Sequence, residues 1–119
     1  MAHRCRVLLV EDDCATREQL SEVLRLWGYT VDTAADGEEA LNLVQRNPPP
    51  HVLLVDLLMP RLSGWELIAE IKKNERLSRI PLVVVSGCSQ DERLLPPADA
   101  HLGKPLDLGR LHELLGRLC

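Results

Sequence analysis

The chain has 119 residues, which suits one globular domain with a core of its own. Hydrophobic residues make up 45% of the chain but aromatic residues only 3%, so that core must be aliphatic. The net charge of −4 gives no general attraction to nucleic acid or anionic membranes, and no apolar run approaches the length of a membrane span.

The residue pattern of the first half of the chain predicts alternating strands and helices. Residues Cys5–Val10 form an apolar strand that runs into three consecutive acids, Glu11–Asp13. A helix follows, with apolar residues at helical spacing, and Gly28 is its predicted stop. A second, weaker strand is predicted over Thr30–Ala34, and a second helix begins after Asp36 and ends at three prolines.

The next stretch is a strand of four apolar residues, Val52–Val55, which ends on Asp56. An uninterrupted apolar run of this kind is typical of a strand buried on both faces. The pattern of Ser63–Glu66 is a capping box that opens a third helix. Pro81 then precedes a further buried strand, Leu82–Ser86.

The last third is irregular at its start. Ser89–Glu92 repeats the capping-box pattern, but Pro96–Pro97 limits any helix there to about two turns. A short strand over Ala100–Gly103 follows, and Lys104 comes directly after it. Asp107 is the predicted cap of the final helix. That helix has a stripe of leucines that we expect in the core: Leu108, Leu111, Leu115 and Leu118.

The four cysteines lie far apart, with no Cys-x-x-Cys pair: Cys5, Cys14, Cys88 and Cys119. This spacing predicts neither a zinc site nor a disulfide framework. The first four residues lead straight into a strand, which is not the pattern of a signal peptide. We therefore expect reduced thiols in a cytoplasmic protein.

Alternating strands and helices predict an α/β fold with a parallel sheet covered on both faces. The strands end on Glu11–Asp13, Asp56, Ser86 and Lys104, and parallel strands bring such ends to one edge. Clustered carboxylates bind hard cations, and a site with few carboxylates suits Mg²⁺. A lysine and a hydroxyl beside them favour phosphoryl transfer, with Asp56 as the nucleophile.

Each of these residues also has a structural interpretation when taken alone. The acid triplet could be a solvated loop, Asp56 and Ser86 could be turn residues, and Lys104 could be an ordinary surface lysine. Their occurrence at four strand ends favours the functional interpretation.

Four motifs carry a family resemblance: Leu8–Asp13, Val55–Pro60 with Gly64, Val83–Gly87 and Lys104–Pro105. With them the whole chain, residues 1–119, resembles the receiver domain of two-component response regulators, the family of the chemotaxis protein CheY. The resemblance implies a doubly wound, five-stranded parallel sheet of strand order 2-1-3-4-5, with helices on both faces.

The resemblance also implies a phosphorylation site. In it Asp56 accepts a phosphoryl group from a histidine kinase or a histidine phosphotransfer protein. Mg²⁺ is held by Glu11, Asp12, Asp56 and the backbone carbonyl of Leu58. Arg17 follows Asp12 at the family spacing, which identifies Glu11 and Asp12 as the acidic pair and Asp13 as an additional acid.

Other residues take their expected roles from the same resemblance. Lys104 pairs with the aspartate and then with the phosphoryl oxygens, and the Lys104–Pro105 bond is expected to be cis. Ser86 binds a phosphoryl oxygen, and Ser86 and His101 form the conformational switch. Such a domain acts by contact with a downstream protein, which the sequence does not name, and not on nucleic acid or membrane. Its only catalysis is its own phosphorylation and dephosphorylation.

One stretch departs from the family. The segment between Ser86 and Lys104 is shorter than in most relatives by about one helical turn. We therefore expect the fourth helix of ordinary receivers to be shortened or missing, and the output surface to differ.

Two other functions share part of this pattern. A Mg²⁺-dependent phosphatase of similar architecture usually has a second aspartate two residues beyond its nucleophile, and that position is Leu58 here. A receiver-like binding domain that acts without phosphorylation is the other alternative, and the full set of polar residues argues against it.

Overall fold

The computed structural model describes residues 5–46, 49–56, 64–86 and 98–119. Its strands are β1 (Arg6–Val10), β2 (Thr30–Ala34), β3 (Val52–Asp56), β4 (Leu82–Ser86) and β5 (Ala100–Gly103). Its α-helices within these ranges are α1 (Cys14–Leu26), α2 (Gly37–Val44), α3 (Gly64–Lys73) and α4 (Leu108–Leu118), and a 3₁₀ turn, η1, covers Leu77–Arg79. The segment in which a shortened fourth helix is expected, residues 87–97, lies outside the described residues.

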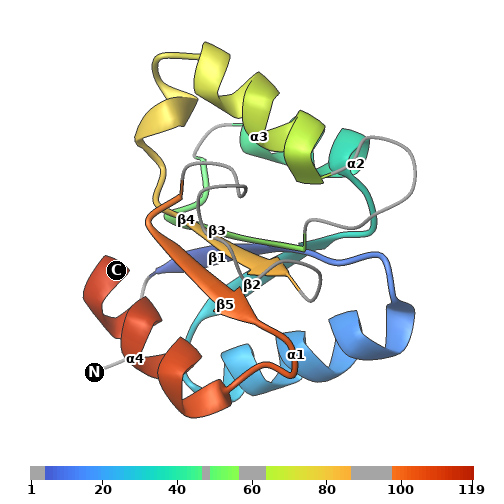
Figure 1. Cartoon of the computed structure of the whole chain (residues 1–119), viewed down its shortest axis with the longest axis vertical. Helices are drawn as coiled ribbons and strands as arrows, with labels where there is room; N and C mark the ends of the chain where they lie inside the picture. Colours follow the sequence, from blue (N-terminus) through green and yellow to red (C-terminus); the bar gives the residue numbers. More distant parts are fainter. Residues whose placement is uncertain (1–4, 47–48, 57–63, 87–97) are drawn as a thin grey trace.

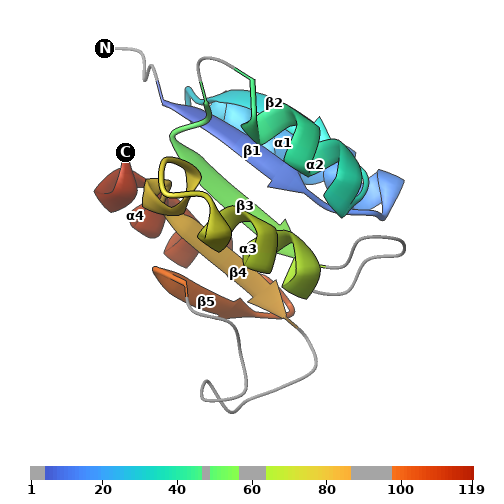
Figure 2. The same cartoon turned by 90° about the horizontal axis from the view of Figure 1, so that it is seen from above.

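All five strands pair in parallel, in the order β2-β1-β3-β4-β5. This confirms the doubly wound sheet. Helices α1 and α4 cover one face and α2 and α3 the other, as Figures 1 and 2 show. The chain leaves β1 toward β2 and returns on the other side to β3, so strand order reverses between β1 and β3. Ligands of doubly wound folds bind outside the carboxyl ends of the strands at such a point.

Alternate residues of each strand supply two separate cores. In β1, Leu8 and Val10 pack with α2 and α3, whereas Val7 and Leu9 pack with α1 and α4. This follows from the two-residue period of a strand, which directs successive side chains to opposite faces. Every residue of β3 is buried, as the apolar run predicts.

The end of α1 is set by Gly28, which has a φ of 98°. This conformation suits glycine because it has no Cβ. The Gly28 amide donates to the Arg25 carbonyl at 3.0 Å, and the Tyr29 amide donates to the Leu24 carbonyl at 3.2 Å. These two bonds form a Schellman motif, so the predicted stop is confirmed.

Three aspartates begin helices. Asp13, Asp36 and Asp107 each accept a hydrogen bond from the backbone amide three residues ahead, at 2.9, 2.9 and 3.1 Å. Each bond satisfies an amide that has no partner inside the helix. The cap predicted for the last helix is thereby confirmed, whereas Ser63 lies outside the described residues.

The predicted leucine stripe of α4 is wrong at its first position. Leu111 and Leu115 are fully buried, but Leu108 is 43% exposed, and Leu114 is buried instead. Leu108 borders a shallow groove between α4 and α1 and does not enter the core. Within the described residues, no helix combines the length and the hydrophobicity that a membrane span requires.

Two of the four cysteines are joined in this structure, where the spacing predicted no disulfide. Cys5 and Cys119 form a disulfide, with their Cα atoms 5.8 Å apart. The tertiary fold brings these two cysteines together, because β1 starts at the amino edge of the sheet and α4 returns to that edge. Cys14 is a free, exposed thiol, and Cys88 lies outside the described residues.

We predict that Leu111→Ala destabilises the fold by about 2–5 kcal/mol, because it leaves a cavity in a core that cannot fully collapse. Leu108→Ala removes the same atoms from the same helix at an exposed position, and we expect it to cost less than about 1 kcal/mol. Urea unfolding measures both. Equal losses from the two variants would contradict this assignment of the core face.

Candidate functional site

Three carboxylates meet at the carboxyl edge of β1 and β3. Glu11, Asp12 and Asp56 each place one carboxylate oxygen so that all three atoms lie within 4.8 Å of one another. Strand pairing produces this, since Val10 lies beside Val55 and the acids follow directly. The ladder continues past β1, where the Glu11 amide donates to a carbonyl of β2 at 3.0 Å. The predicted acidic cluster is therefore present and could hold a metal ion.

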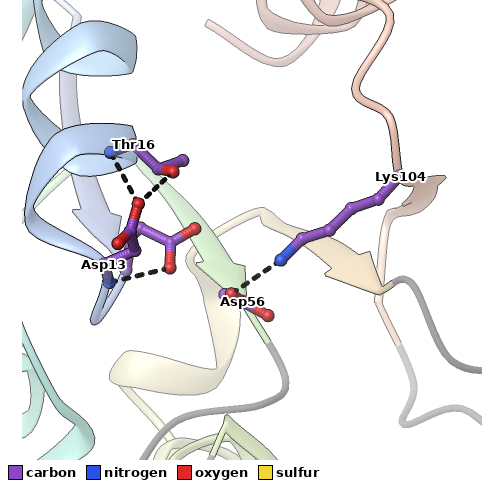
Figure 3. Close-up of polar contacts among 5 residues, drawn as sticks. Asp13, Thr16, Asp56 and Lys104 are labelled. Carbon is purple, nitrogen blue, oxygen red and sulfur yellow. Dashed lines mark hydrogen bonds and ion pairs between the residues drawn. The ribbon is translucent and has the colours of Figure 1, made fainter.

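A lysine that follows the edge strand β5 reaches this cluster. The Lys104 Nζ atom lies 3.0 Å from Asp56 Oδ2, and Figure 3 shows it reaching over from beyond β5. The Asp56 side chain is only 6% exposed, while that of Lys104 is 43% exposed. A buried carboxylate requires such a partner because unpaired burial of a charge is costly.

The pKa of Glu11 is raised from 4.5 to about 7. Burial is the largest cause, and the charge and hydrogen bonding of Asp56 add to it. A hydrogen bond from the Asp13 amide to Glu11 Oε2, at 3.2 Å, acts in the opposite direction. Glu11 is thus partly protonated near neutral pH, and binding of a cation favours its ionised form.

The pKa of Lys104 shifts for the complementary reason. Burial lowers it, but the hydrogen bond and charge of Asp56, together with the charges of Glu11 and Asp12, outweigh burial and raise it. The amine therefore remains an ammonium throughout the neutral range, available to an anion at Asp56.

Asp13, the third acid of the triplet, faces another way. Its carboxylate accepts hydrogen bonds from the Thr16 amide and the Thr16 hydroxyl (Figure 3). These bonds lower its pKa. Asp13 is therefore the cap of α1 and lies outside the three-carboxylate cluster, in agreement with the expected register.

Arg17 holds the loop that carries the acids. Its Nη1 atom donates to the backbone carbonyls of Glu11 at 2.9 Å and Asp12 at 3.3 Å. The sequence supplied only the spacing of Arg17. Its contact with main-chain carbonyls leaves no signal in the pattern of residue types, so this positioning contact was not predicted.

A cavity of about 200 Å³ lies beside the cluster. Glu11, Asp56 and Lys104 line its polar part, and apolar residues such as Leu54 and Leu106 line the rest. The paired Asp56 and Lys104 side chains therefore border open space as well as the other two carboxylates.

The remaining predicted residues lie on β4 and β5 or outside the described residues. Ser86 ends β4 opposite Gly103, one position before Lys104, so its main chain borders the site. His101 is half-buried in β5, opposite Val84. Leu58 lies outside the described residues. The Lys104–Pro105 bond is cis, as expected.

Fold and site together define a doubly wound α/β domain with an acidic, lysine-paired pocket at its switch point. The family model of the response regulator receiver domain matches residues 7–116, and the chain belongs to this family.

Its relatives agree. The chain is 39% identical over 117 residues to the response regulator MprA of Mycobacterium sp. strain KMS, covering 95% of this chain and 48% of that protein. It thus spans about half the length of the curated relatives it matches. A response regulator receiver protein from Pseudomonas putida superposes with a TM-score of 0.88 at 32% identity, covering 98% of this chain and 99% of that one.

A second solved structure is informative about the site. The receiver domain of the sensor histidine kinase PA1611 from Pseudomonas aeruginosa superposes with a TM-score of 0.88 at 28% identity, covering 98% of both chains. That protein has a magnesium ion coordinated in its active-site cleft.

We predict that, in the absence of divalent cations, thermal stability falls as pH rises from about 5 to about 8. The folded-state pKa of Glu11, about 7, lies above its ordinary value of 4.5. Between these two pH values the folded protein therefore binds more protons than the unfolded chain does. That stabilisation is complete below about pH 4.5 and is lost as pH rises through about 7.

Differential scanning fluorimetry in EDTA measures the effect. Glu11→Gln should flatten the slope, whereas Asp13→Asn should leave it unchanged, since an asparagine also caps the helix. A wild-type slope that survives Glu11→Gln would assign the pH dependence to other groups.

Proposed function

We propose that Asp56 accepts a phosphoryl group from the phosphohistidine of a histidine kinase or a histidine phosphotransfer protein. The observation that carries this is the 3.0 Å contact of Lys104 with Asp56 inside a cluster that contains two further carboxylates. We infer that the receiver domain extends over residues 1–119, that it acts in the cytoplasm, and that a downstream protein responds to its state.

The chemistry is a displacement at phosphorus. An Asp56 oxygen attacks the phosphorus atom, the phosphorus–nitrogen bond of phosphohistidine breaks, and its electron pair returns to the imidazole. Positioning and electrostatic stabilisation account for most of the catalysis of such transfers. Lys104 releases the carboxylate and binds phosphoryl oxygens through its ammonium. The Ser86 hydroxyl donates to another phosphoryl oxygen.

Glu11, Asp12 and Asp56 would hold Mg²⁺, together with the carbonyl of Leu58. Fully ionised, these three carboxylates outnumber the one ammonium by two charges, which a divalent cation neutralises. Oxygen ligands and few protein carboxylates are the donor set that suits this ion. The magnesium ion in the cleft of the Pseudomonas aeruginosa receiver supports the assignment. The bound ion supplies charge neutralisation at the phosphoryl oxygens.

The change of state starts at Asp56. Phosphorylation adds negative charge and acceptor oxygens at the residue that Lys104 contacts. In our proposal Ser86 moves toward these oxygens, and the His101 ring turns inward behind it. The strand pairing of β4 with β5 gives this coupling a short path.

The test is incubation with acetyl phosphate and Mg²⁺, followed by intact mass spectrometry. We expect one acid-stable, base-labile phosphoryl group on the wild type and none on Asp56→Asn or in EDTA. Asp13→Asn is the matched control, because it neutralises a neighbouring acid of the same loop that lies outside the cluster, and it should still be phosphorylated.

The other outcomes separate the alternatives. Repeated turnover of a phosphate ester would identify a phosphatase. A protein that is never modified would be a receiver-like binding domain that acts without phosphorylation. Labelling that persists in Asp56→Asn would overturn the assignment of the acceptor.

We further predict that Arg17→Ala weakens Mg²⁺ binding by roughly 10-fold, a typical loss when the support of metal ligands is removed. Arg17 bonds the carbonyls of Glu11 and Asp12, so its loss frees the loop that orients both carboxylates. The Mg²⁺ concentration that gives half of the maximal rise in Tm measures the affinity.

Arg25→Ala is the control. It removes the same charge from the same helix, but its guanidinium bonds the Val31 carbonyl, away from the acids. We expect this variant to lower Tm and leave the Mg²⁺ midpoint unchanged. A similar midpoint shift in both variants would attribute the effect to net charge and not to the carbonyl contacts.

A further inference from the structure

Two cysteines at opposite ends of the sequence meet at the amino edge of the sheet. Cys5 precedes β1, and Cys119 caps the end of α4, 114 positions further along the chain. Their Cα atoms are 5.8 Å apart, within the range of roughly 4.4–6.8 Å that a disulfide spans. The backbone therefore allows this bond without rearrangement, at the edge opposite to the carboxylate cluster.

The pair lies against packed structure. Cys5 belongs to the core between the sheet and helices α1 and α4, and Leu118, beside Cys119, packs against that core. On the same face, the Trp27 and His112 rings stack with centroids 4.3 Å apart and join the end of α1 to α4. A bond between Cys5 and Cys119 thus fixes the last turn of α4 to the start of β1.

The two sulfurs differ in access. Cys5 is 8% exposed, whereas Cys119 is exposed. Thiol–disulfide exchange requires the attacking thiolate to reach a sulfur in line with its partner, so reagents from solvent reach Cys119 first. This arrangement makes Cys119 the entry point and Cys5 the resolving thiol.

We propose that Cys5 and Cys119 form a reversible redox clamp on α4, closed by low-molecular-weight disulfides of the glutathione class and opened by dithiols. In closing, the Cys119 thiolate attacks the small disulfide, forms a mixed disulfide and releases one small thiolate. The Cys5 thiolate then attacks the Cys119 sulfur and releases the second. Two protein thiols are oxidised, and one small disulfide is reduced to two thiols.

In a reducing compartment, such a disulfide can respond to changes in redox state. Cytoplasmic proteins seldom keep structural disulfides, because glutathione and thioredoxin reduce them. In the compartment inferred above, the pair is open under reducing conditions and closes under oxidative stress. Closure joins residues 114 positions apart and therefore restricts the unfolded chain strongly. The clamp does not depend on phosphorylation of Asp56.

The experiment uses the full 119-residue chain, equilibrated with oxidised glutathione or with dithiothreitol. Differential alkylation and peptide mapping should show a Cys5–Cys119 link in the first sample and free thiols in the second. The oxidised protein should melt roughly 10 °C higher, an effect typical of a bond that closes a long loop. Hydrogen exchange should be slower in the last turn of α4.

Cys119→Ser should abolish the difference in Tm between the two conditions. This site is exposed, so the variant folds even if substitution of the buried Cys5 does not. Cys14→Ser is the matched control: it removes the exposed thiol at the start of α1 and should keep the full difference. Mapping that finds Cys5 free in oxidised glutathione, or a Tm difference that persists in Cys119→Ser, would overturn the clamp.

Discussion

The structure depends on a concentration of negative charge that one ammonium only partly compensates. Glu11 and Asp56 are buried side chains at the ends of two adjacent strands, and Asp12, the third member of the cluster, is exposed. Burial is the main cause of the raised pKa of Glu11, and it also strengthens the repulsion between Glu11 and Asp56 and the attraction that binds Lys104 to Asp56. The fold keeps these groups together because β1 and β3 are buried on both faces and their pairing fixes where each acid emerges.

Most of this arrangement could be predicted from the sequence because it follows from local patterns. Apolar runs of four or five residues locate the inner strands, and the polar residue that follows each run marks the edge where ligands bind. Gly28 and Asp107 mark helix ends through their own backbone and side-chain chemistry. The family motifs add the strand order and the cis bond at Pro105.

The features that could not be predicted depend on contacts between elements that are distant in the sequence. The pairing of Cys5 with Cys119 requires that the first strand and the last helix end at the same edge, which spacing alone does not reveal. The exposure of Leu108 depends on where α4 meets α1, although its spacing fits the buried stripe. Arg17 contacts backbone carbonyl groups, which every residue has. The side-chain types in the sequence therefore do not show which residues Arg17 contacts.

The two cores share the strands but no side chains, since alternate residues of each strand enter one or the other. Substitutions beneath α2 and α3 can therefore be accommodated without repacking the layer beneath α1 and α4. Over evolutionary time the two helical surfaces can diverge independently, each adapting to different protein partners. The carboxyl edge, where both layers end at the same few polar residues, has no such freedom.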